Sequence, residues 1–232
     1  MGAQLPLPTP WRLLLTAIYL LVYPVLVLAL GGDLRWIEGW LFAGWFVGTS
    51  FLIVVYLYRK DPALLAERYR RPDQDTQRWD RVFVYGISVV FLVWLAVMPL
   101  DAVRFHWTPA WPILLEVVGG LLLIASTGLL FRAFADNTFL SPLVRIQEER
   151  QHQVVSSGVY SFVRHPMYLG AVGMAIGAPL LLGSAVGVGL GIVLVGLIVA
   201  RIRGEERLLV DRLRGYADYR QQVRYRLIPH VW

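Results

Sequence analysis

Cysteine is absent from the sequence, and histidine and charged residues are scarce. Without cysteine among its 232 residues, the chain can form no disulfide, thiolate metal site or cysteine nucleophile. The 4 histidines are far apart in the sequence, which argues against a metal cluster. Charged residues make up 16% of the chain and hydrophobic residues 57%, whereas an average soluble domain has about 25% charged residues. These proportions predict an integral membrane protein without a bound metal.

The first apolar run has the features of a retained membrane helix. Residues 1–10 lack the basic segment of a signal peptide, and no small-residue cleavage site follows them. Three further apolar runs have a similar length, and a polar segment separates the second from the third. In that segment, Asp61-Pro62 can begin a short surface helix. The sequence thus predicts four membrane helices, over about residues 11–30, 37–58, 82–100 and 112–134.

The last apolar run, residues 166–199, is too long for one membrane crossing. As a single helix it would measure about 51 Å, against about 30 Å for the hydrocarbon core of a bilayer. Pro179 and Gly183-Ser184 interrupt the run. We therefore predict a helical hairpin of two antiparallel helices of about 16 residues each, whose many glycines permit close helix contact.

Two polar segments flank this hairpin. Residues 136–164 contain alternating polar and β-branched residues, which predict a small β-hairpin or paired extended segments. Residues 201–232 form a basic tail, helical at first. We expect an all-α integral membrane protein with five or six transmembrane helices. A four-span region, residues 1–135, and a C-terminal region, residues 136–232, would form one structural unit.

The distribution of basic residues predicts the orientation of the chain. If the N-terminus is cytoplasmic and the chain crosses six times, the cytoplasmic segments hold 19 of the 22 Lys and Arg residues, as the positive-inside rule requires. Both termini are then cytoplasmic. Such a basic rim attracts anionic lipid headgroups. No motif of interleaved aromatic and basic residues outside the membrane context indicates nucleic-acid binding.

The junction before the last apolar run carries the most informative motif, Arg164-His165-Pro166-Met167-Tyr168-Leu169-Gly170. Proline is suited to the first position of a helix, so a helix begins here. The backbone N–H groups of its first turn then form an anion site, suited to a carboxylate or a phosphate. Arg164 and His165 could reinforce this site. Alternatively, Arg164 extends to lipid headgroups and His165 only caps the helix.

Two acidic residues, Glu205 and Glu206, directly follow the hairpin. Neighbouring residues on a helix point about 100° apart, so they cannot serve one site together from the same face. Glu206 shares a face with apolar residues and is predicted to point inward, where a carboxylate needs a partner; this favours a functional role. For Glu205 we favour a solvated ion pair with Arg201, four residues earlier.

Further polar residues lie near the same end of the predicted bundle. Arg132 and Asn137 stand at the inner end of the fourth predicted span, where Arg132 could reach headgroups or receive a substrate carboxylate. Tyr160 could lie over the same pocket. Tyr216 and Tyr219 are typical of an interfacial belt, although one ring could instead stack on an adenine.

The order and spacing of these motifs resemble the isoprenylcysteine carboxyl methyltransferase family, to which phospholipid N-methyltransferases are related. The resemblance covers about residues 137–229, and the segment 61–68 looks like that of bacterial members, so we expect a bacterial inner-membrane protein. It implies an S-adenosylmethionine-dependent methyltransferase whose cofactor lies at the cytoplasmic end of the last hairpin. Carried over residue by residue, the cofactor site would comprise Tyr160, Arg164, His165, Tyr168, Gly170, Glu205 and Glu206.

The resemblance also implies a lipophilic acceptor, most simply an isoprenylcysteine-like carboxylate that becomes a methyl ester. A carboxylate is already ionised at neutral pH, so catalysis would consist of alignment and desolvation. A cation such as Arg132 or Arg203 would orient the acceptor, Asn137 would contact it, and Gly170 would let the cofactor approach the backbone. An amine or phenol acceptor would need a base, for which Glu206 and His165 are the candidates.

Two other classes of protein stay open at this point. Membrane sterol and steroid reductases have similar Arg-His-Pro-x-Tyr stretches and bind NADPH, for whose additional phosphate Arg145 or Arg150 could provide a basic group. A non-enzymatic membrane protein or transporter would carry polar groups at mid-membrane. The predicted spans contain almost none.

Overall fold

The computed structural model describes residues 10–72, 76–109 and 111–232. Throughout these ranges the regular structure is helical, as predicted. A π-helical turn, η1 (Leu100–Arg104), extends α4, and two 3-10 turns, η2 (Glu148–Arg150) and η3 (Gly158–Ser161), lie in the polar segment before the hairpin. The α-helices are α1 (Pro10–Gly31), α2 (Ile37–Lys60), α3 (Pro62–Arg68), α4 (Arg78–Pro99), α5 (Ile113–Asp136), α6 (Pro166–Leu182), α7 (Ala185–Arg212) and α8 (Tyr216–Gln222).

The long helices have the length and apolarity of membrane spans. Among the described residues, four helices are long and apolar enough to cross a bilayer: α2, α4 with η1, α5 and α7. Helix α6 is apolar but has 17 residues, which corresponds to about 26 Å. Large apolar side chains cover the outside of the bundle, for example Leu52, Val89 and Leu121, as expected of a surface that contacts lipid rather than water. The protein is therefore an integral membrane protein, while six crossings stay a prediction.

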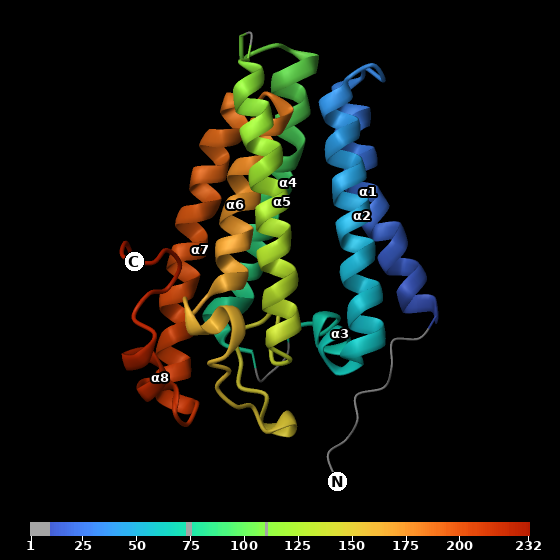
Figure 1. Cartoon of the computed structure of the whole chain (residues 1–232). Helices are drawn as coiled ribbons and strands as arrows, with labels where there is room; N and C mark the ends of the chain where they lie inside the picture. Colours follow the sequence, from blue (N-terminus) through green and yellow to red (C-terminus); the bar gives the residue numbers. More distant parts are fainter. Residues whose placement is uncertain (1–9, 73–75, 110) are drawn as a thin grey trace.

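The helices run side by side, and the polar segments gather at one end of the bundle (Figure 1). Helices α3 and α8 and the segment 137–165 all lie at this end. Helix α1 packs against α2 and α4, and α6 packs against α5 and α7. The main apolar core joins these elements through residues such as Val27, Trp94 and Leu182. The polar end is thus held in place by a continuous apolar bundle.

Glycines allow α5 and α6 to approach each other closely. A Cβ atom added at Gly119 would lie 2.7 Å from the carbonyl oxygen of Gly177. One added at Gly173 would collide with the Ser126 side chain. The glycines of α6 were predicted to serve contact within the hairpin, and Gly191 of α7 does so against Ala175. The three glycines of α6, Gly170, Gly173 and Gly177, instead serve the packing against α5.

The predicted helical hairpin is confirmed, with its turn at Gly183 and Ser184. Gly183 has a φ of 78°, a left-handed conformation in which glycine carries no steric cost. Ser184 caps α7, and its hydroxyl donates to the buried carboxylate of Asp101 at 2.6 Å. The same carboxylate accepts from the Thr108 amide at 2.7 Å. Pro179 stays inside α6, so the chain reverses at the glycine and the cap rather than at the proline.

Residues 137–165 form no β-strand, which corrects the predicted β-hairpin. Their backbone groups bond instead to acidic side chains of the long helices. The amide of Val144 donates to Asp80 at 2.7 Å, and the amide of Val159 donates to Asp136 at 2.9 Å. Because these amides have side-chain partners, a strand ladder is not needed to satisfy them.

Candidate functional site

A cavity of about 90 Å³ lies at the polar end, between the segment 137–155, the start of α6, the end of α7 and α8. Six residues that the sequence assigned to the site line it: Asn137, Tyr160, Arg164, His165, Tyr168 and Glu205. They come from three separate stretches of the chain, at 137, 160–168 and 205, which the tertiary fold brings together. The cavity is smaller than typical ligand pockets of about 300–1,000 Å³, so the surrounding segments must part to admit a nucleoside-sized ligand.

The first turn of α6 forms one wall of this cavity. Helix α6 begins with Pro166 at its first position, after the predicted His165-Pro166 boundary. The first intrahelical hydrogen bond runs from the amide of Leu169 to the carbonyl of His165 at 3.1 Å. Met167 and Tyr168 line the cavity, and their backbone amides, in the first turn of the helix, have no intrahelical acceptor. This arrangement can bind an anion.

Two tyrosine hydroxyls in the cavity wall, those of Tyr160 and Tyr216, are buried without a hydrogen bond of good geometry among the described residues. The Tyr160 hydroxyl faces the side chain of Asn137. Burial raises the pKa of both phenols, so each hydroxyl stays protonated and able to donate. A buried hydroxyl without a partner costs about 1–3 kcal/mol. A polar ligand in the cavity would recover that free energy.

Glu205 lines the cavity and accepts a hydrogen bond from the hydroxyl of Tyr168 at 2.7 Å. The predicted ion pair with Arg201 is wrong. Arg201 instead binds the carboxylate of Asp80 at 2.9 and 3.0 Å, together with the carbonyl of Pro142. Glu205 thus presents its carboxylate to the cavity, although the sequence favoured a solvated position for it.

Glu206 is buried, as its apolar face predicted, and binds three basic side chains. Its carboxylate accepts from Arg164 at 2.7 Å and from Arg226 at 2.7 Å, and it lies 3.2 Å from His165. It does not line the cavity. Its surroundings are those of a structural anchor, and the predicted catalytic role finds no support in them.

Arg164 holds the C-terminal segment against the start of α6. Its Nη1 donates to the carbonyls of Val223 and Arg224, both at 2.7 Å. Its backbone amide donates to the carbonyl of Tyr225 at 3.0 Å. Because Nε is bound to Glu206, much of the guanidinium is engaged within the protein. It is therefore less available to a ligand than the sequence suggested.

The remaining predicted residues differ in their positions. Asn137 lines the cavity, and its side-chain oxygen accepts from the amide of Phe139 at 2.8 Å. Gly170 faces α5, where an added Cβ would lie 3.1 Å from the carbonyl oxygen of Ser126, so helix packing requires the glycine. Arg132 pairs with Asp136 on an exposed flank, and Arg203 is exposed, with its guanidinium 5.9 Å from the Trp232 ring centroid. Neither arginine lines the cavity.

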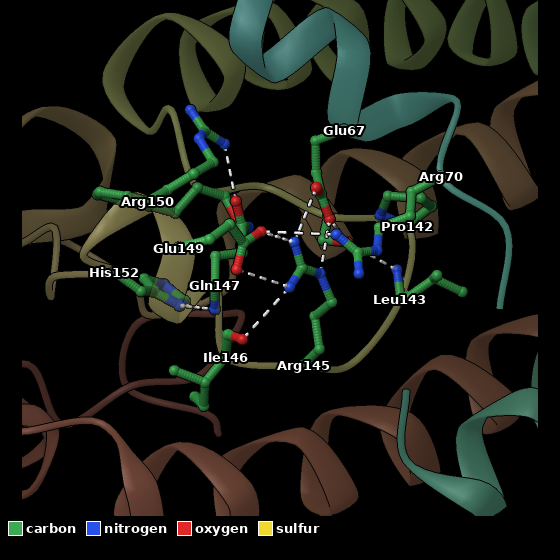
Figure 2. Close-up of polar contacts among 12 residues, drawn as sticks. Glu67, Arg70, Pro142, Leu143, Arg145, Ile146, Gln147, Glu149, Arg150 and His152 are labelled. Carbon is green, nitrogen blue, oxygen red and sulfur yellow. Dashed lines mark hydrogen bonds and ion pairs between the residues drawn. The ribbon is translucent and has the colours of Figure 1, made fainter. Parts of the chain in front are cut away.

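A buried ion pair that the sequence analysis missed fixes the segment over the cavity (Figure 2). Nε and Nη2 of Arg145 donate to the two carboxylate oxygens of Glu67, each at 3.0 Å. Figure 2 shows the same guanidinium also facing Glu149. Glu67 follows Leu64 by three residues on α3 and so shares its buried face. This spacing was the feature of the sequence from which a buried position for Glu67 could have been predicted.

The other polar groups of this segment are engaged as well. Arg150 donates to the carbonyl of Thr138 at 2.8 Å and to the side chain of Gln147 at 2.7 Å. His152 stacks on Phe139, with 4.8 Å between ring centroids. Burial and the nearby arginines lower the pKa of His152 to about 4, so this imidazole is neutral at pH 7.

Residues 121–211 match the isoprenylcysteine carboxyl methyltransferase (ICMT) family. This part of the chain is similar to that family. The match includes the cavity residues from Asn137 to Glu205. It confirms the resemblance on which the predicted site was based, and it leaves out the first three predicted spans and the basic tail beyond residue 211.

Similar proteins are known from fungi and plants. The protein-S-isoprenylcysteine O-methyltransferase of Saccharomyces cerevisiae is 37% identical over 115 residues, 47% of this chain and 47% of that protein. The Schizosaccharomyces pombe protein of the same name is 36% identical over 85 residues, 36% of each chain. The matched segments thus span less than half the length of either fungal protein.

A solved structure of an ICMT-family enzyme has a similar fold. The structure of a eukaryotic intramembrane Ras methyltransferase, ICMT, aligns with a TM-score of 0.54. The alignment covers 92% of this chain and 74% of that one at 22% sequence identity. It shows that the arrangement of the helical bundle is similar in the two proteins.

Proposed function

We propose that this protein is an S-adenosylmethionine-dependent methyltransferase that converts the carboxylate of a lipophilic, isoprenylcysteine-like acceptor into its methyl ester. The observation that carries the proposal is the cavity between the start of α6, Glu205 and the tyrosines 160 and 216. The fungal relatives that match this part of the chain are protein-S-isoprenylcysteine O-methyltransferases, and their name supports the choice of acceptor.

The polar groups of the cavity fit the chemistry of the cofactor. The unbonded amides of Met167 and Tyr168 suit its carboxylate. The carboxylate of Glu205 suits either its ammonium group or its ribose hydroxyls. The free hydroxyls of Tyr160 and Tyr216 can donate to its remaining acceptors. When bound, S-adenosylmethionine supplies a methyl group on a positively charged sulfur.

The task of the protein in this reaction is to align the acceptor and exclude water. A carboxylate acceptor with a pKa of about 4 is ionised at neutral pH, so no general base is required. Glu206 does not need to act as one, in keeping with its three basic partners. Alignment and desolvation then carry the catalysis.

Reduction by NADPH is not favoured, because the basic groups suggested for its additional phosphate are occupied. Arg145 binds Glu67 and Glu149, and Arg150 binds Thr138 and Gln147.

We further propose that the polar end faces the cytoplasm of a bacterial inner membrane, with both termini inside. This rests on the 19 basic residues in the segments assigned to that side. Residues 136–232 would then be the methyltransferase region, supported by residues 1–135.

Calorimetric titration of detergent-solubilised protein with S-adenosylhomocysteine and with NADPH tests the proposal. We expect S-adenosylhomocysteine to bind and Glu205→Gln to weaken binding by about tenfold, the value of a charged hydrogen bond. Asp211→Asn, at an exposed position on the same helix, is the control and should bind like the wild type. Folded protein that binds NADPH alone, or neither ligand, would refute the proposed function.

A further inference from the structure

Arg68, the last residue of α3, holds a buried guanidinium nitrogen that nothing in the described chain satisfies. Its Nη1 atom is buried and has no hydrogen-bond partner. The guanidinium lies 5.3 Å from the ring centroid of Phe134 on α5. Burial lowers the pKa of Arg68, and the nearby Arg201 lowers it further. A buried cation without a counterion is costly, so an anion bound at this point would be stabilised strongly.

The acidic side chains near Arg68 form their hydrogen bonds and ion pairs with other residues of the described chain. Glu67, next to it in the sequence, receives both its Arg145 hydrogen bonds and one from Ser141 at 2.7 Å. Asp80 is also engaged, because it is paired with Arg201, the basic neighbour of Arg68. Arg68 therefore keeps hydrogen-bonding capacity for a ligand.

Arg68 stands behind one wall of the cavity, on the side of α3. Phe134, beneath its guanidinium, packs in an apolar cluster that includes Leu140 and Met167. Those two residues also line the cavity, as does Tyr168, whose hydroxyl acts electrostatically on Arg68. Figure 1 shows α3 and α8 on opposite flanks of the polar end of α5 and α6. The Arg68 side is thus the apolar side, where a lipophilic ligand can pack.

We infer that Arg68 binds the carboxylate of the methyl acceptor, while the acceptor's apolar chain packs on the cluster around Phe134. This inference rests on the proposed function and replaces the sequence-based choice of Arg132, which is paired with Asp136, or Arg203, which is exposed. Arginine suits the task, because its planar donors match the two oxygens of a carboxylate. The apolar surroundings exclude water from the pair.

The reaction gives this cation a role both before and after methyl transfer. One oxygen of the bound carboxylate forms a bond to the methyl carbon, the bond between that carbon and sulfur breaks, and its electron pair stays on sulfur. No proton moves. The products are a neutral methyl ester and a neutral thioether, so the ester loses its charge attraction to Arg68. The site therefore holds the acid more tightly than the product, which favours release of the ester.

Steady-state methylation of N-acetyl-S-farnesylcysteine tests the assignment, with the carboxamide of the same compound as a competing ligand. For Arg68→Gln we expect KM to rise by about 10- to 100-fold, the range of a charged hydrogen-bonded pair, with a smaller change in kcat. The preference of the wild type for the acid over the amide should disappear, and Arg68→Lys should restore part of it. Arg71→Gln, the same change at an exposed arginine of the same segment, should behave like the wild type.

Two further measurements separate a binding role from a structural one. S-Adenosylhomocysteine should bind Arg68→Gln as it binds the wild type. Arg68→Met, which removes a buried nitrogen that has no partner among the described residues, should unfold no earlier than the wild type in the absence of acceptor. An unchanged preference for the acid in Arg68→Gln, or earlier unfolding of Arg68→Met, would overturn the assignment alone. Wild-type protein that binds no S-adenosylhomocysteine would overturn the proposed function and this inference with it.

Discussion

The adjacent residues Glu205 and Glu206 should respond differently to the same substitution. Glu206→Gln removes the charge that holds Arg164, His165 and Arg226 together. Breaking a buried ion pair costs about 3–5 kcal/mol. Because Arg226 is 30% exposed and contributes less than a buried partner, we expect a loss near the lower end, about 3 kcal/mol. For a chain of this length that lowers the midpoint of thermal unfolding by about 6–12 °C.

Glu205→Gln should have the opposite profile. Its carboxylate makes one hydrogen bond, from Tyr168 at 2.7 Å, so we expect a loss of stability of about 1 kcal/mol. Its affinity for S-adenosylhomocysteine should fall about tenfold, because the carboxylate lines the cavity. Thermal unfolding and calorimetric titration of the two variants side by side measure both quantities.

Hydrogen exchange locates the effect of Glu206→Gln. The C-terminal segment is tied to α6 through Arg164 and Glu206, so amides of residues 223–232 should exchange faster in this variant and not in Glu205→Gln. If Glu206→Gln unfolded at the wild-type temperature and lost only its affinity for S-adenosylhomocysteine, Glu206 would be a ligand of the cofactor. The structural role derived from its three basic partners would then be wrong.

Three further predictions follow from the packing and the buried polar groups. In thermal unfolding, Gly119→Ala should destabilise the protein by about 1–3 kcal/mol, because the added Cβ would lie 2.7 Å from the Gly177 oxygen. Gly120→Ala, whose nearest contact is at 3.8 Å, should be tolerated. Equal effects of the two substitutions would contradict the packing of α5 on α6. Tyr216→Phe removes a hydroxyl without a partner among the described residues, so the variant should keep the stability of the wild type. It should bind S-adenosylhomocysteine about fivefold more weakly. A clear loss of stability would show that the hydroxyl already has a hydrogen-bond partner in the protein. The pKa of His152 is about 4 in the folded protein and about 6.5 in the unfolded chain. The contribution of this histidine to stability should therefore be complete above pH 6.5, and the free energy of unfolding should fall by at most about 3 kcal/mol as the pH drops to 4. Denaturation measured across that pH range should show a flatter dependence for His152→Phe, and an unchanged slope would refute the prediction.

Features that depend on neighbouring residues could be read from the sequence. Apolar runs of membrane length marked the long helices, and Asp61-Pro62 marked the start of α3, where Asp61 caps the helix with a hydrogen bond from Leu64 at 2.9 Å. His165-Pro166 marked the start of α6 in the same way. The periodicity of α7 placed Glu206 inside. These signals are local, because hydrophobic periodicity and capping act within a few turns of one helix.

The predicted β-hairpin over 136–164 failed for the converse reason. Its alternating pattern is compatible with strands when the amides have no other acceptors. Asp80 and Asp136 provide such acceptors from distant helices. No local pattern in the segment indicates that these two carboxylates will lie beside it. The sequence therefore could not distinguish an irregular segment held by side chains from a pair of strands.

The sequence by itself determined the all-helical membrane character, the positions of the long helices and the similarity of residues 121–211 to the methyltransferase family. It also pointed to six of the residues that line the cavity. Only the tertiary structure decided the partner of each charge. Arg145 finds Glu67 across 78 residues, and Arg164 finds Glu206 across 42. In a low-dielectric interior a charge binds whichever opposite charge the fold places beside it, and sequence separation carries no information about that choice.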